Sequence, residues 1–440
     1  MASVGLIGAG VSSLHLGFRL LEAGFQATLY AQKRPEEILN GPLQNSVSHQ
    51  YDTVEREQAM GIDFWNEGNC RVARGHNHWL QVPDAPALEF WGSFDGYGKC
   101  VDYRLYIPRL MEEFEKRGGK VAYQDVSAAD IDELTDLYDV VAVGVGKFRN
   151  SLADFFPVQE ELSSHTEPAR LLCCGVFEGI RDSDPLGVTI SISVGHGELI
   201  VLPMENQTGP ATALLFENRR GGDLEDLMTL DYAADPGAFL QRVLEVLEQH
   251  HGSTYRRVDH AGFRLTRPVD LLQGCFTPVT RRPWAKVSND KFVLATGDLR
   301  CTMDPVTGQG ANLASYGAWV WADHIIEAGG KIDESVCREY ENAVAYRTAG
   351  TVNFNNAILD PEPFLPGLLH AMSENAPMAD DFTRRFACPE TLWWEVLQDE
   401  ATCRAYMDRF RVAPAEPASH WSLDDVNATA VASGGKSTVP

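Results

Sequence analysis

Two glycines near the start of the chain have the spacing of a phosphate-binding turn. They form the pattern Gly8-x-Gly10-x-x-Ser13, which follows the apolar run SVGLI at residues 3–7 and precedes a helical pattern. Gly8 permits a tight turn, Gly10 lets the backbone approach a pyrophosphate, and the helix N-terminus directs unpaired N–H groups at the phosphates. An unoccupied structural turn is the alternative. The predicted dinucleotide contacts of this turn are Gly8, Gly10, Val11, Ser12 and Ser13.

The second predicted strand, Ala27–Tyr30, lacks the acidic residue expected at its end to hold a ribose hydroxyl. The sequence there reads Ala31, Gln32, Lys33, Arg34, and the Gln32 side chain can still accept that hydrogen bond. Gln32 and Arg34 are therefore the candidates at this position. The missing acid is consistent with weak or reversible cofactor binding.

A second motif indicates which dinucleotide binds. The segment ATGD at 295–298 ends a predicted strand, and DPVTGQGAN at 304–312 opens a predicted helix. The pair resembles the second FAD fingerprint of glutathione-reductase-like flavoproteins, whose Asp holds the ribitol and whose G-Q-G helix start faces the flavin. Reduced flavin is an anion, which free N–H groups at a helix N-terminus stabilise. The predicted FAD contacts are Gly297, Asp298, Pro305, Gly308, Gly310, Ala311 and Asn312.

The elements that must position these motifs alternate between strands and helices. The opening βαβ pattern continues with a helix over 104–117, a buried strand over 138–145, a strand over 291–298 and a helix over 310–328. Between about 170 and 225 the sequence contains the β-rich segments VTISISV, GELIVLPM and TALLFENR, a pattern that is typical of an antiparallel sheet. A helix is expected over 236–250.

These patterns predict an α/β fold: a glutathione-reductase-like Rossmann FAD-binding domain with an inserted β-rich substrate-binding domain and a helical C-terminal region. The expected FAD-binding domain is discontinuous, and the substrate-binding domain takes two segments. The boundaries are 1–65, 100–168 and 276–335 for FAD binding, 66–99 and 169–275 for substrate binding, 336–412 for the helical region, and 413–440 for a flexible tail.

Composition excludes several classes of function. The chain has 440 residues, with 37 Lys plus Arg against 62 Asp plus Glu and a formal net charge of −25, so it repels nucleic acid and anionic membranes on average. No apolar run is long enough to span a membrane, and the apolar N-terminus lacks the basic region of a signal peptide. We expect a cytoplasmic protein whose nine scattered cysteines are reduced and mostly buried, without a metal site.

Several longer segments identify a family. VDYRLYIPRL (101–110), YDVVAVGVGK (138–147), GHGELI (195–200) and GDLRCTMDPVTGQGANLASYGAW (297–319) resemble the oxygenase component of styrene and indole monooxygenases. The resemblance implies a two-component FAD monooxygenase, which transfers oxygen to its substrate. Reduced FAD comes from a separate NADH-dependent flavin reductase and reacts with O2 to a C4a-hydroperoxide. That species epoxidises styrene-like alkenes or indole, or oxidises thioethers. A homodimer is also implied.

The same resemblance points to an active-site loop. In LQNSVSH (43–49), Asn45, Val47 and His49 match the styrene-type members, whereas indole-type members carry Ser, Gln and Met there. The resemblance therefore implies catalytic roles for Asn45, Val47 and His49, and cofactor contacts for Asn45 and Ser46. Pro305 is a further catalytic candidate, because its ring lacks a donor and can press on the flavin edge.

Other candidates remain open. Arg104 can reach the FAD pyrophosphate or form a surface ion pair. Residues 66–100 depart from the family pattern, and their Trp79, Phe90 and Trp91 can line an aromatic pocket or pack in the core. His196 is expected in a hairpin turn, with a role in the substrate-binding domain as the alternative. The sequence offers no metal partner for the pair HH at 250–251.

Two other classes of function share this fold. A single-component NAD(P)H-dependent hydroxylase is less favoured, because the chain has VGVGK at 143–147 where such enzymes carry Ala-Asp-Gly. It also shows no separate nicotinamide fingerprint. A non-enzymatic binding protein on the same scaffold is expected to have lost its flavin contacts, and the intact turn at 308–312 argues against it.

Overall fold

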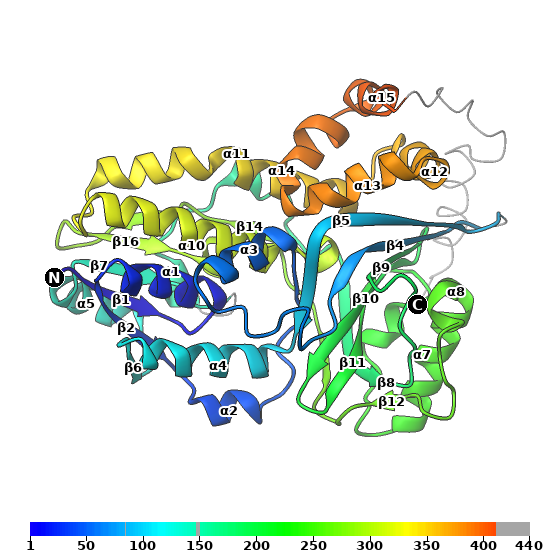
Figure 1. The fold of residues 1–440 in the computed structure, drawn as a ribbon, viewed down its shortest axis with the longest axis horizontal. Helices are drawn as coiled ribbons and strands as arrows, with labels where there is room; N and C mark the ends of the chain where they lie inside the picture. The colour runs from blue at the N-terminus through cyan, green and yellow to red at the C-terminus, as the bar shows by residue number, and fades with distance from the viewer. Residues whose placement is uncertain (84, 147–149, 411–440) are drawn as a thin grey trace, which may run out of the picture.

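The computed structural model describes residues 1–83, 85–146 and 150–410. Two sheets lie side by side, with helices along one side of both (Figure 1). The predicted tail at 413–440 and Lys147 lie outside the described residues. No helix of the described part is long and apolar enough to cross a membrane.

The first sheet has six strands in the order β15-β16-β7-β1-β2-β6, which are parallel except for β15. Its apolar runs are buried on both faces, as expected for a parallel sheet that helices cover. The strands are β1 (Ser3–Ile7), β2 (Gln26–Ala31), β6 (Lys120–Tyr123), β7 (Val140–Val143), β15 (Trp284–Lys286) and β16 (Phe292–Ala295).

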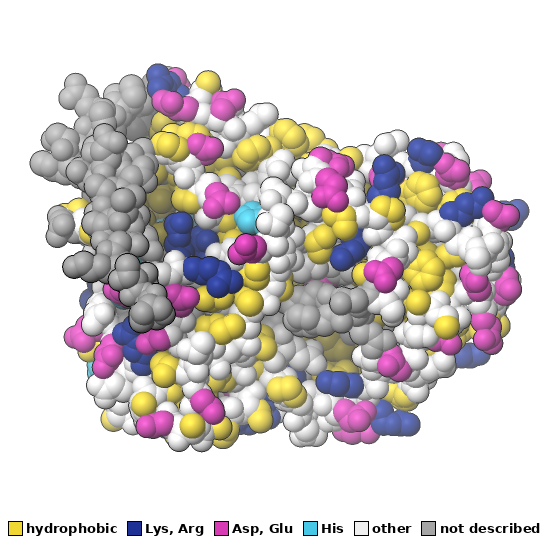
Figure 2. Space-filling view, turned by 180° about the vertical axis from the view of Figure 1, so that it is seen from behind, with side chains coloured by type: hydrophobic (Ala, Val, Ile, Leu, Met, Phe, Trp, Pro, Cys, Tyr) yellow, Lys and Arg dark blue, Asp and Glu magenta, His cyan; other side chains and the backbone are white. Residues whose placement is uncertain are grey.

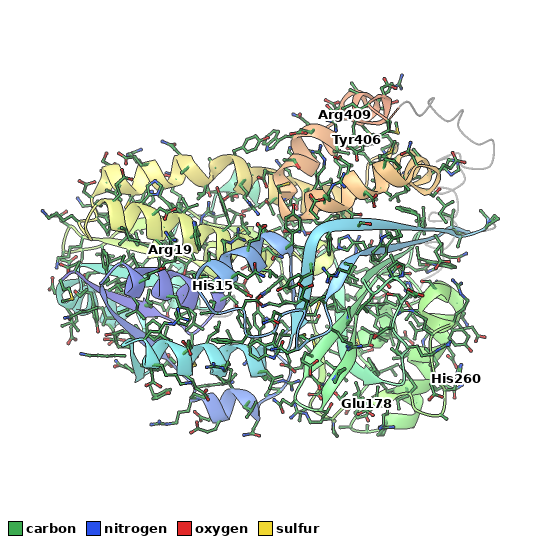
Figure 3. The ribbon with its side chains drawn as sticks, in the orientation of Figure 1. His15, Arg19, Glu178, His260, Tyr406 and Arg409 are labelled. Atoms are coloured by element: carbon green, nitrogen blue, oxygen red, sulfur yellow. The ribbon has the colours of Figure 1, made fainter. Side chains whose placement is uncertain are left out.

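Helices α1 (Val11–Glu22), α4 (Tyr103–Lys116) and α10 (Gly310–Glu327) form one core with this sheet. His15 and Arg19 lie on the face of α1 that meets α10, where they contact Ser315 and Asp323 (Figure 3). The shorter helices around this sheet are α2 (Pro35–Leu39), α3 (Tyr51–Ala59), α5 (Ile131–Leu137), α6 (Asn150–Ala153) and α9 (Gly297–Arg300).

The second sheet has nine strands and is largely antiparallel. The long strand β5 pairs with β4 along most of its length, and its last residues lie beside β10. The strands are β3 (Ser48–His49), β4 (Ala73–Gln81), β5 (Leu88–Val101), β8 (Leu171–Glu178), β9 (Val188–Ser193), β10 (Gly197–Asn206), β11 (Gly209–Asn218), β12 (Arg264–Leu265) and β13 (Leu271–Gly274). A separate pair joins β14 (Val279–Thr280) to β17 (Cys301–Thr302).

One face of the second sheet is covered by α7 (Pro236–His250), whose apolar stripe packs on β8, β10 and β11. The short α8 (Gly252–Tyr255) follows it. The C-terminal helices pack on β4 and β5, so closely that a side chain at Gly92 would collide with Thr383. These helices are α11 (Glu334–Leu359), α12 (Leu365–Glu374), α13 (Ala376–Arg384), α14 (Pro389–Leu392) and α15 (Glu400–Asp408).

The architecture confirms the predicted α/β class, with a Rossmann-type sheet, a β-rich insertion and a helical C-terminal region. The cysteines in the structure are free, as expected, but Cys70, Cys275 and Cys388 are only half-buried. On the face turned away in Figure 1, acidic and basic side chains are interspersed, so the visible surface presents no broad basic field (Figure 2). This distribution agrees with the acidic net charge.

Candidate functional site

The predicted cofactor turns meet at one edge of the first sheet. Because β1, β2, β7 and β16 are parallel, their carboxyl ends face the same way, and the chain leaves the sheet there into each predicted motif. Gly8 has a left-handed φ of 97°, and a Cβ at this position would lie 2.6 Å from the carbonyl oxygen of Gly144. Only glycine fits this turn.

The two fingerprints are in direct contact, although they are far apart in the chain. The Ser12 hydroxyl donates to Thr296 Oγ1 at 3.2 Å. A side chain at Gly144 would collide with both Ser13 and Thr296, and one at Gly297 would lie 2.7 Å from Ser12 Oγ. The strand ends therefore form one continuous backbone surface from the first motif to the second.

Both motif helices begin without a side-chain cap. Gly10 is the N-cap of α1 and Gln309 is the N-cap of α10, and neither helix start donates a capping hydrogen bond to a side chain of its N-cap residue. The N–H groups of the first turn of each helix are thus free to bind an anion. Ser13 adds a buried hydroxyl without a hydrogen-bond partner in the described structure.

The turn before α10 has room for a flat ligand. Gly308 is left-handed, with φ 66°, and a Cβ built on Gly308 or Gly310 would meet no atom within 4 Å. The turn is nevertheless rigid, because Asn355 donates to the Asp304 carbonyl at 2.9 Å and to Thr307 Oγ1 at 2.8 Å. Uncapped helix starts, an unpartnered hydroxyl and an open glycine cradle fit the FAD that the two motifs predict.

Substitution of Gly308 tests this cradle. We expect Gly308→Ala to weaken FAD binding about tenfold or more, because an added methyl group in a fitted site costs about 1–3 kcal/mol. Left-handed strain adds about 1–2 kcal/mol of destabilisation. The measurement is a titration with FAD beside a thermal melt.

Gly118→Ala is the matched control, since Gly118 is also left-handed, at φ 93°, has free space around its Cβ, and follows α4 away from the cradle. It should lose similar stability with unchanged FAD affinity. Equal affinity of the Gly308→Ala and wild-type proteins would show that the turn does not face the cofactor.

The candidates at the end of β2 lie on the surface. Gln32 donates its amide to Asp125 at 2.8 Å, which leaves its carbonyl oxygen as the acceptor for a ribose hydroxyl. The Arg34 guanidinium stacks on Tyr123, 4.3 Å from the ring centroid. Both side chains are exposed, so a cofactor held there contacts solvent as well as protein.

Three hydrogen bonds hold the predicted active-site loop in place. The Leu43 N–H donates to the Val269 carbonyl at 3.0 Å, Ser46 Oγ lies 3.3 Å from Cys174 Sγ, and the Ser48 carbonyl accepts from Asn312 at 3.0 Å. Asn45 lies between these points, and its buried Oδ1 has no hydrogen-bond partner in the described structure. An unpaired amide oxygen on a fixed loop is suited to bind a ligand.

Val47 packs against the same core as Ala9 and Ala311, one residue from each fingerprint. Asn312 joins the loop to α10. Its Oδ1 accepts from the Gln50 N–H at 2.9 Å and from Thr53 Oγ1 at 2.7 Å, and its amide also donates to the Gly308 carbonyl at 2.8 Å. The Asn312 side chain is thus fully hydrogen-bonded within the protein, and its backbone N–H is the group that can contact the cofactor.

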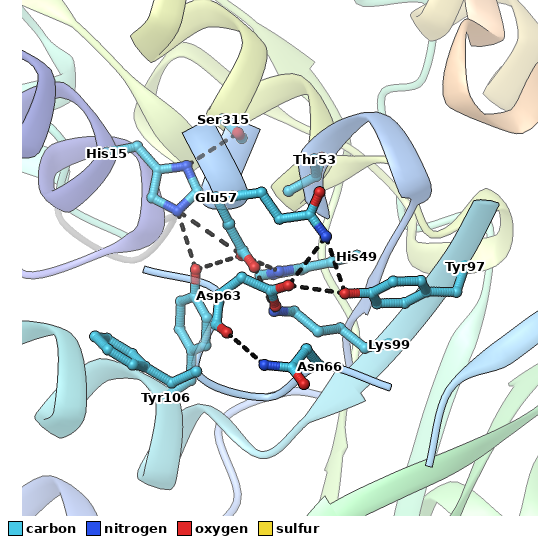
Figure 4. Close-up of polar contacts among 12 residues, drawn as sticks. His15, His49, Thr53, Glu57, Asp63, Asn66, Tyr97, Lys99, Tyr106 and Ser315 are labelled. Carbon is cyan, nitrogen blue, oxygen red and sulfur yellow. Dashed lines mark hydrogen bonds and ion pairs between the residues drawn. The ribbon is translucent and has the colours of Figure 1, made fainter. Parts of the chain in front are cut away.

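His49 lies in a buried polar network rather than on an open surface (Figure 4). Its Nδ1 is 2.7 Å from Glu57 Oε1, and its Nε2 is 2.9 Å from the Tyr103 hydroxyl. Because a carboxylate only accepts, His49 donates from Nδ1 and accepts from Tyr103 at Nε2. Both nitrogens are occupied, so this histidine can position the loop through its neighbours.

The network has one consistent direction of hydrogen bonding. Tyr106 donates to Glu57 at 2.6 Å, so its oxygen accepts from His15 Nε2 at 3.0 Å, and His15 Nδ1 accepts from Ser315 at 3.0 Å. Lys99 Nζ lies 2.5 Å from Glu57 Oε2 and pairs also with Asp63. Every group is satisfied only if Glu57 is ionised and both histidines are neutral.

Electrostatics favour an ionised Glu57 and a neutral His15. Burial alone would raise the pKa of Glu57, but His49 and Lys99 hold it well below its usual range. Burial lowers the pKa of His15 to about 3. Burial also raises the pKa of Tyr106 well above its ordinary value, so its hydroxyl remains a donor.

Arg104 is neither a surface residue nor free. It is fully buried, and its guanidinium pairs with Asp102 at 2.5 Å and with Asp270 at 2.7 Å. The predicted surface ion pair is therefore wrong, because both partners lie inside the protein between α4 and the loop before β13. A contact between Arg104 and the pyrophosphate stays a prediction.

An apolar wall lies beside the G-Q-G turn. The Gln309 amide donates to the Phe386 carbonyl at 3.0 Å, and the His76 ring contacts Phe386 and Phe94 edge to face, at 4.5 and 4.9 Å. Burial holds the pKa of His76 well below its usual value, so the ring is neutral. This aromatic group, together with Asn45, is the strongest candidate for the substrate-facing surface.

The aromatic residues of the divergent segment lie further along β4 and β5. Phe90 stacks on His78, with their ring centroids 4.6 Å apart. The Arg256 guanidinium lies over the Trp79 ring, and the Trp91 indole donates to Ser93. These contacts favour the packing alternative over an aromatic pocket.

Sequence reasoning missed the centre of the buried network. Glu57 and Lys99 were not candidates, since an acidic residue on a helix and a lysine in a strand are ordinarily solvated. The available signal was the spacing of Tyr103 and Tyr106, three residues apart on one helix face inside a family-like segment. Gln309 was present in a recognised motif, but its role in anchoring Phe386 required the fold.

Comparison with known proteins places the chain among its relatives. Residues 148–257 match a family model described as "Styrene monooxygenase A putative substrate binding domain". The chain is 38% identical over 395 residues to styrene monooxygenase StyA of Pseudomonas fluorescens, covering 89% of this chain and 94% of that protein. It is 39% identical over 396 residues to StyA of a Pseudomonas species, with the same coverage.

Solved structures share the fold at low sequence identity. The flavin-dependent brominase Bmp2 aligns with a TM-score of 0.66 at 12% identity, over 93% of this chain and 98% of that one. The 2-methyl-3-hydroxypyridine-5-carboxylic acid oxygenase aligns with a TM-score of 0.57 at 13% identity, over 86% of this chain and 98% of that one. At these identities the likeness concerns the fold alone.

Proposed function

Because the chain belongs to the styrene monooxygenase family, we propose that it is the FAD-dependent oxygenase component of a two-component styrene monooxygenase. The observation that supports this most is the joined pair of fingerprints, which offers two uncapped helix starts and an open glycine cradle. The family resemblance seen in the motifs is confirmed by the identity over most of the chain.

When bound, reduced FAD supplies the activation of O2. The residues of the chain bind and orient it. The first turns of α1 and α10 stabilise negative charge on the pyrophosphate and the flavin, and Gly308 and Gly310 let the ring approach the backbone. Pro305 opens the short helix before Gly308, at the predicted flavin edge.

The apolar wall and the loop position the substrate. Phe94, Phe386 and neutral His76 would exclude water from the neighbourhood of the flavin, so that the oxygen that reduced FAD activates would go to the substrate rather than be released as peroxide. Asn45 supplies a polar contact, and the buried network around Glu57 holds His49 and the loop in one position. An apolar aromatic alkene such as styrene suits these surroundings, and indole and thioethers are further candidate substrates.

The proposed partner is a separate NADH-dependent flavin reductase. Reduced FAD then has to enter and oxidised FAD has to leave, which agrees with the exposed position of Gln32 at the adenosine end. Homodimerisation, a cytoplasmic location and the predicted domain boundaries belong to the same proposal.

Turnover with externally reduced FAD tests this function. The purified chain is mixed in air with enzymatically reduced FAD and styrene, indole or a phenyl thioether, and the products are quantified. Styrene oxide without NADH consumption by the chain itself is expected. NADH or NADPH oxidation without a reductase would favour the single-component hydroxylase, and failure to bind reduced FAD would favour a binding protein.

Asn45 provides a second test. We expect Asn45→Leu to reduce kcat about tenfold, since a lost polar contact to the reacting groups costs about 1–3 kcal/mol, while the Kd for FAD changes less than about twofold. Gln44→Leu, at the exposed neighbouring position, is the control and should retain full turnover. An equal loss of turnover and FAD affinity in Asn45→Leu would assign this residue to the cofactor instead.

A further inference from the structure

Three side chains that are far apart in the sequence converge at the end of the second sheet. His196 lies in the turn between β9 and β10, Asp223 follows β11, and His250 is the last residue of α7. Their potential ligand atoms all lie within 4.8 Å of one another. We propose that His196, Asp223 and His250 form a binding site for a divalent transition-metal ion such as Zn²⁺.

The distances suit a metal of this size. Asp223 Oδ2 lies 3.4 Å from His250 Nε2 and 3.7 Å from His196 Nδ1. Tetrahedral zinc, with bonds of about 2.0–2.2 Å, places its ligand atoms roughly 3.3–3.6 Å apart. Two imidazoles and one carboxylate favour zinc, nickel or copper over magnesium or calcium, which prefer oxygen ligands throughout.

The surroundings of His250 orient its ring for metal binding. Its side chain is only 9% exposed, its Nδ1 is 2.9 Å from Ser193 Oγ, and its Nε2 makes no hydrogen bond in the described structure. A hydrogen bond at one ring nitrogen orients the other, as is usual for histidines that bind metals.

His196 requires one exchange of partners. Its Nδ1 accepts from the Asp223 N–H at 3.1 Å, so a metal at Nδ1 replaces this hydrogen bond. The ring lies 4.6 Å from that of His250, which allows both to reach one ion. Since His196 is in a turn closed by glycines, a small movement of this turn accommodates the exchange.

The charges around the site leave its carboxylate available to a cation. Arg242 donates to the Asp223 carbonyl, but it also pairs with Asp226 at 2.8 Å and with Glu245 at 3.7 Å, and these two carboxylates offset its charge. A bound ion would link the β9–β10 turn to the end of α7 and stabilise this part of the fold, away from the cofactor edge.

Zinc titration of the full-length chain tests the site. After treatment with a chelator and its removal, calorimetry with ZnCl₂ is expected to show one site per chain and a raised melting temperature. Asp223→Asn and His250→Ala should each weaken binding more than about 100-fold, because loss of an outer partner alone costs about 10–100-fold. Ser193→Ala, which removes that outer partner, should weaken binding about tenfold.

Asp223 is 60% exposed, so its substitution is expected to leave the fold intact. His370→Ala is the matched control, since His370 forms a similar pair with Glu374 on α12, and it should bind zinc as the wild type does. Unchanged zinc affinity in both Asp223→Asn and His250→Ala would overturn the proposal. Loss of binding after alkylation of the half-buried cysteines Cys70, Cys275 and Cys388 would also overturn it, by assigning the zinc to thiolates.

Discussion

Glu57→Gln should destabilise the protein by about 3–5 kcal/mol, because it leaves the buried ammonium of Lys99 without the more deeply buried of its two counter-charges, which both lie at 2.5 Å. The amide would also turn a donor toward Tyr106 or His49, both of which donate to Glu57. The remaining partner of Lys99, Asp63, keeps part of the charge balance. Urea unfolding monitored by circular dichroism measures the change.

A double substitution tests whether the loss of stability comes from the unpaired charge of Lys99. Glu57→Gln combined with Lys99→Met removes both members of the pair, and should recover much of the lost stability, since paired removal is often close to neutral. Glu400→Gln, in the exposed pair with Arg404 on α15, is the control and should cost less than about 1 kcal/mol. A loss below about 1 kcal/mol for Glu57→Gln would show that the network does not support the fold.

The protein should lose stability steeply as the pH falls below 6.5. Burial lowers the pKa of His15, His78 and His251 to about 3 each and that of His76 well below its usual value. Below pH 6.5 the unfolded chain therefore binds four protons that the folded chain excludes. Glu217, whose pKa is raised by burial and by Asp304, opposes this with one proton bound in the folded state.

The net difference of about three protons lowers the free energy of unfolding by about 4 kcal/mol per pH unit between roughly pH 6 and 4.5. Because a domain is stable by only about 5–15 kcal/mol, acid unfolding is expected within this range or just below it. Denaturant titrations at a series of pH values give the slope.

His78→Phe should reduce this slope by about 1.4 kcal/mol per pH unit, since it removes one excluded proton. The ring stacks on Phe90, and its Nε2 has no hydrogen-bond partner in the described structure, so phenylalanine can occupy the same space. His260→Ala is the control, because His260 is exposed on the outer side of the second sheet (Figure 3). A slope that stays the same in His78→Phe would contradict the assignment of a neutral buried ring.

The features of this protein that depend on local order could be predicted from the amino-acid sequence alone. The residue pattern of a short segment predicts strands, glycine turns and helix starts. The turns at Gly8, Gly10 and Gly308 and the helix over 310–328 were therefore predicted correctly. The order of the two fingerprints and the matching segments also identified the family. These features can be predicted because backbone conformation and periodicity are properties of short stretches of chain.

Which polar groups contact one another depends on the fold and could not be predicted from the sequence. Arg104 looked like a surface or cofactor residue until the fold placed Asp270 against it, and His250 had no metal partner until two turns brought His196 and Asp223 to it. His49 was found in sequence, but its partner Glu57 was not. Burial decides the charge and the partners of such groups, and burial depends on packing between segments that no local pattern encodes.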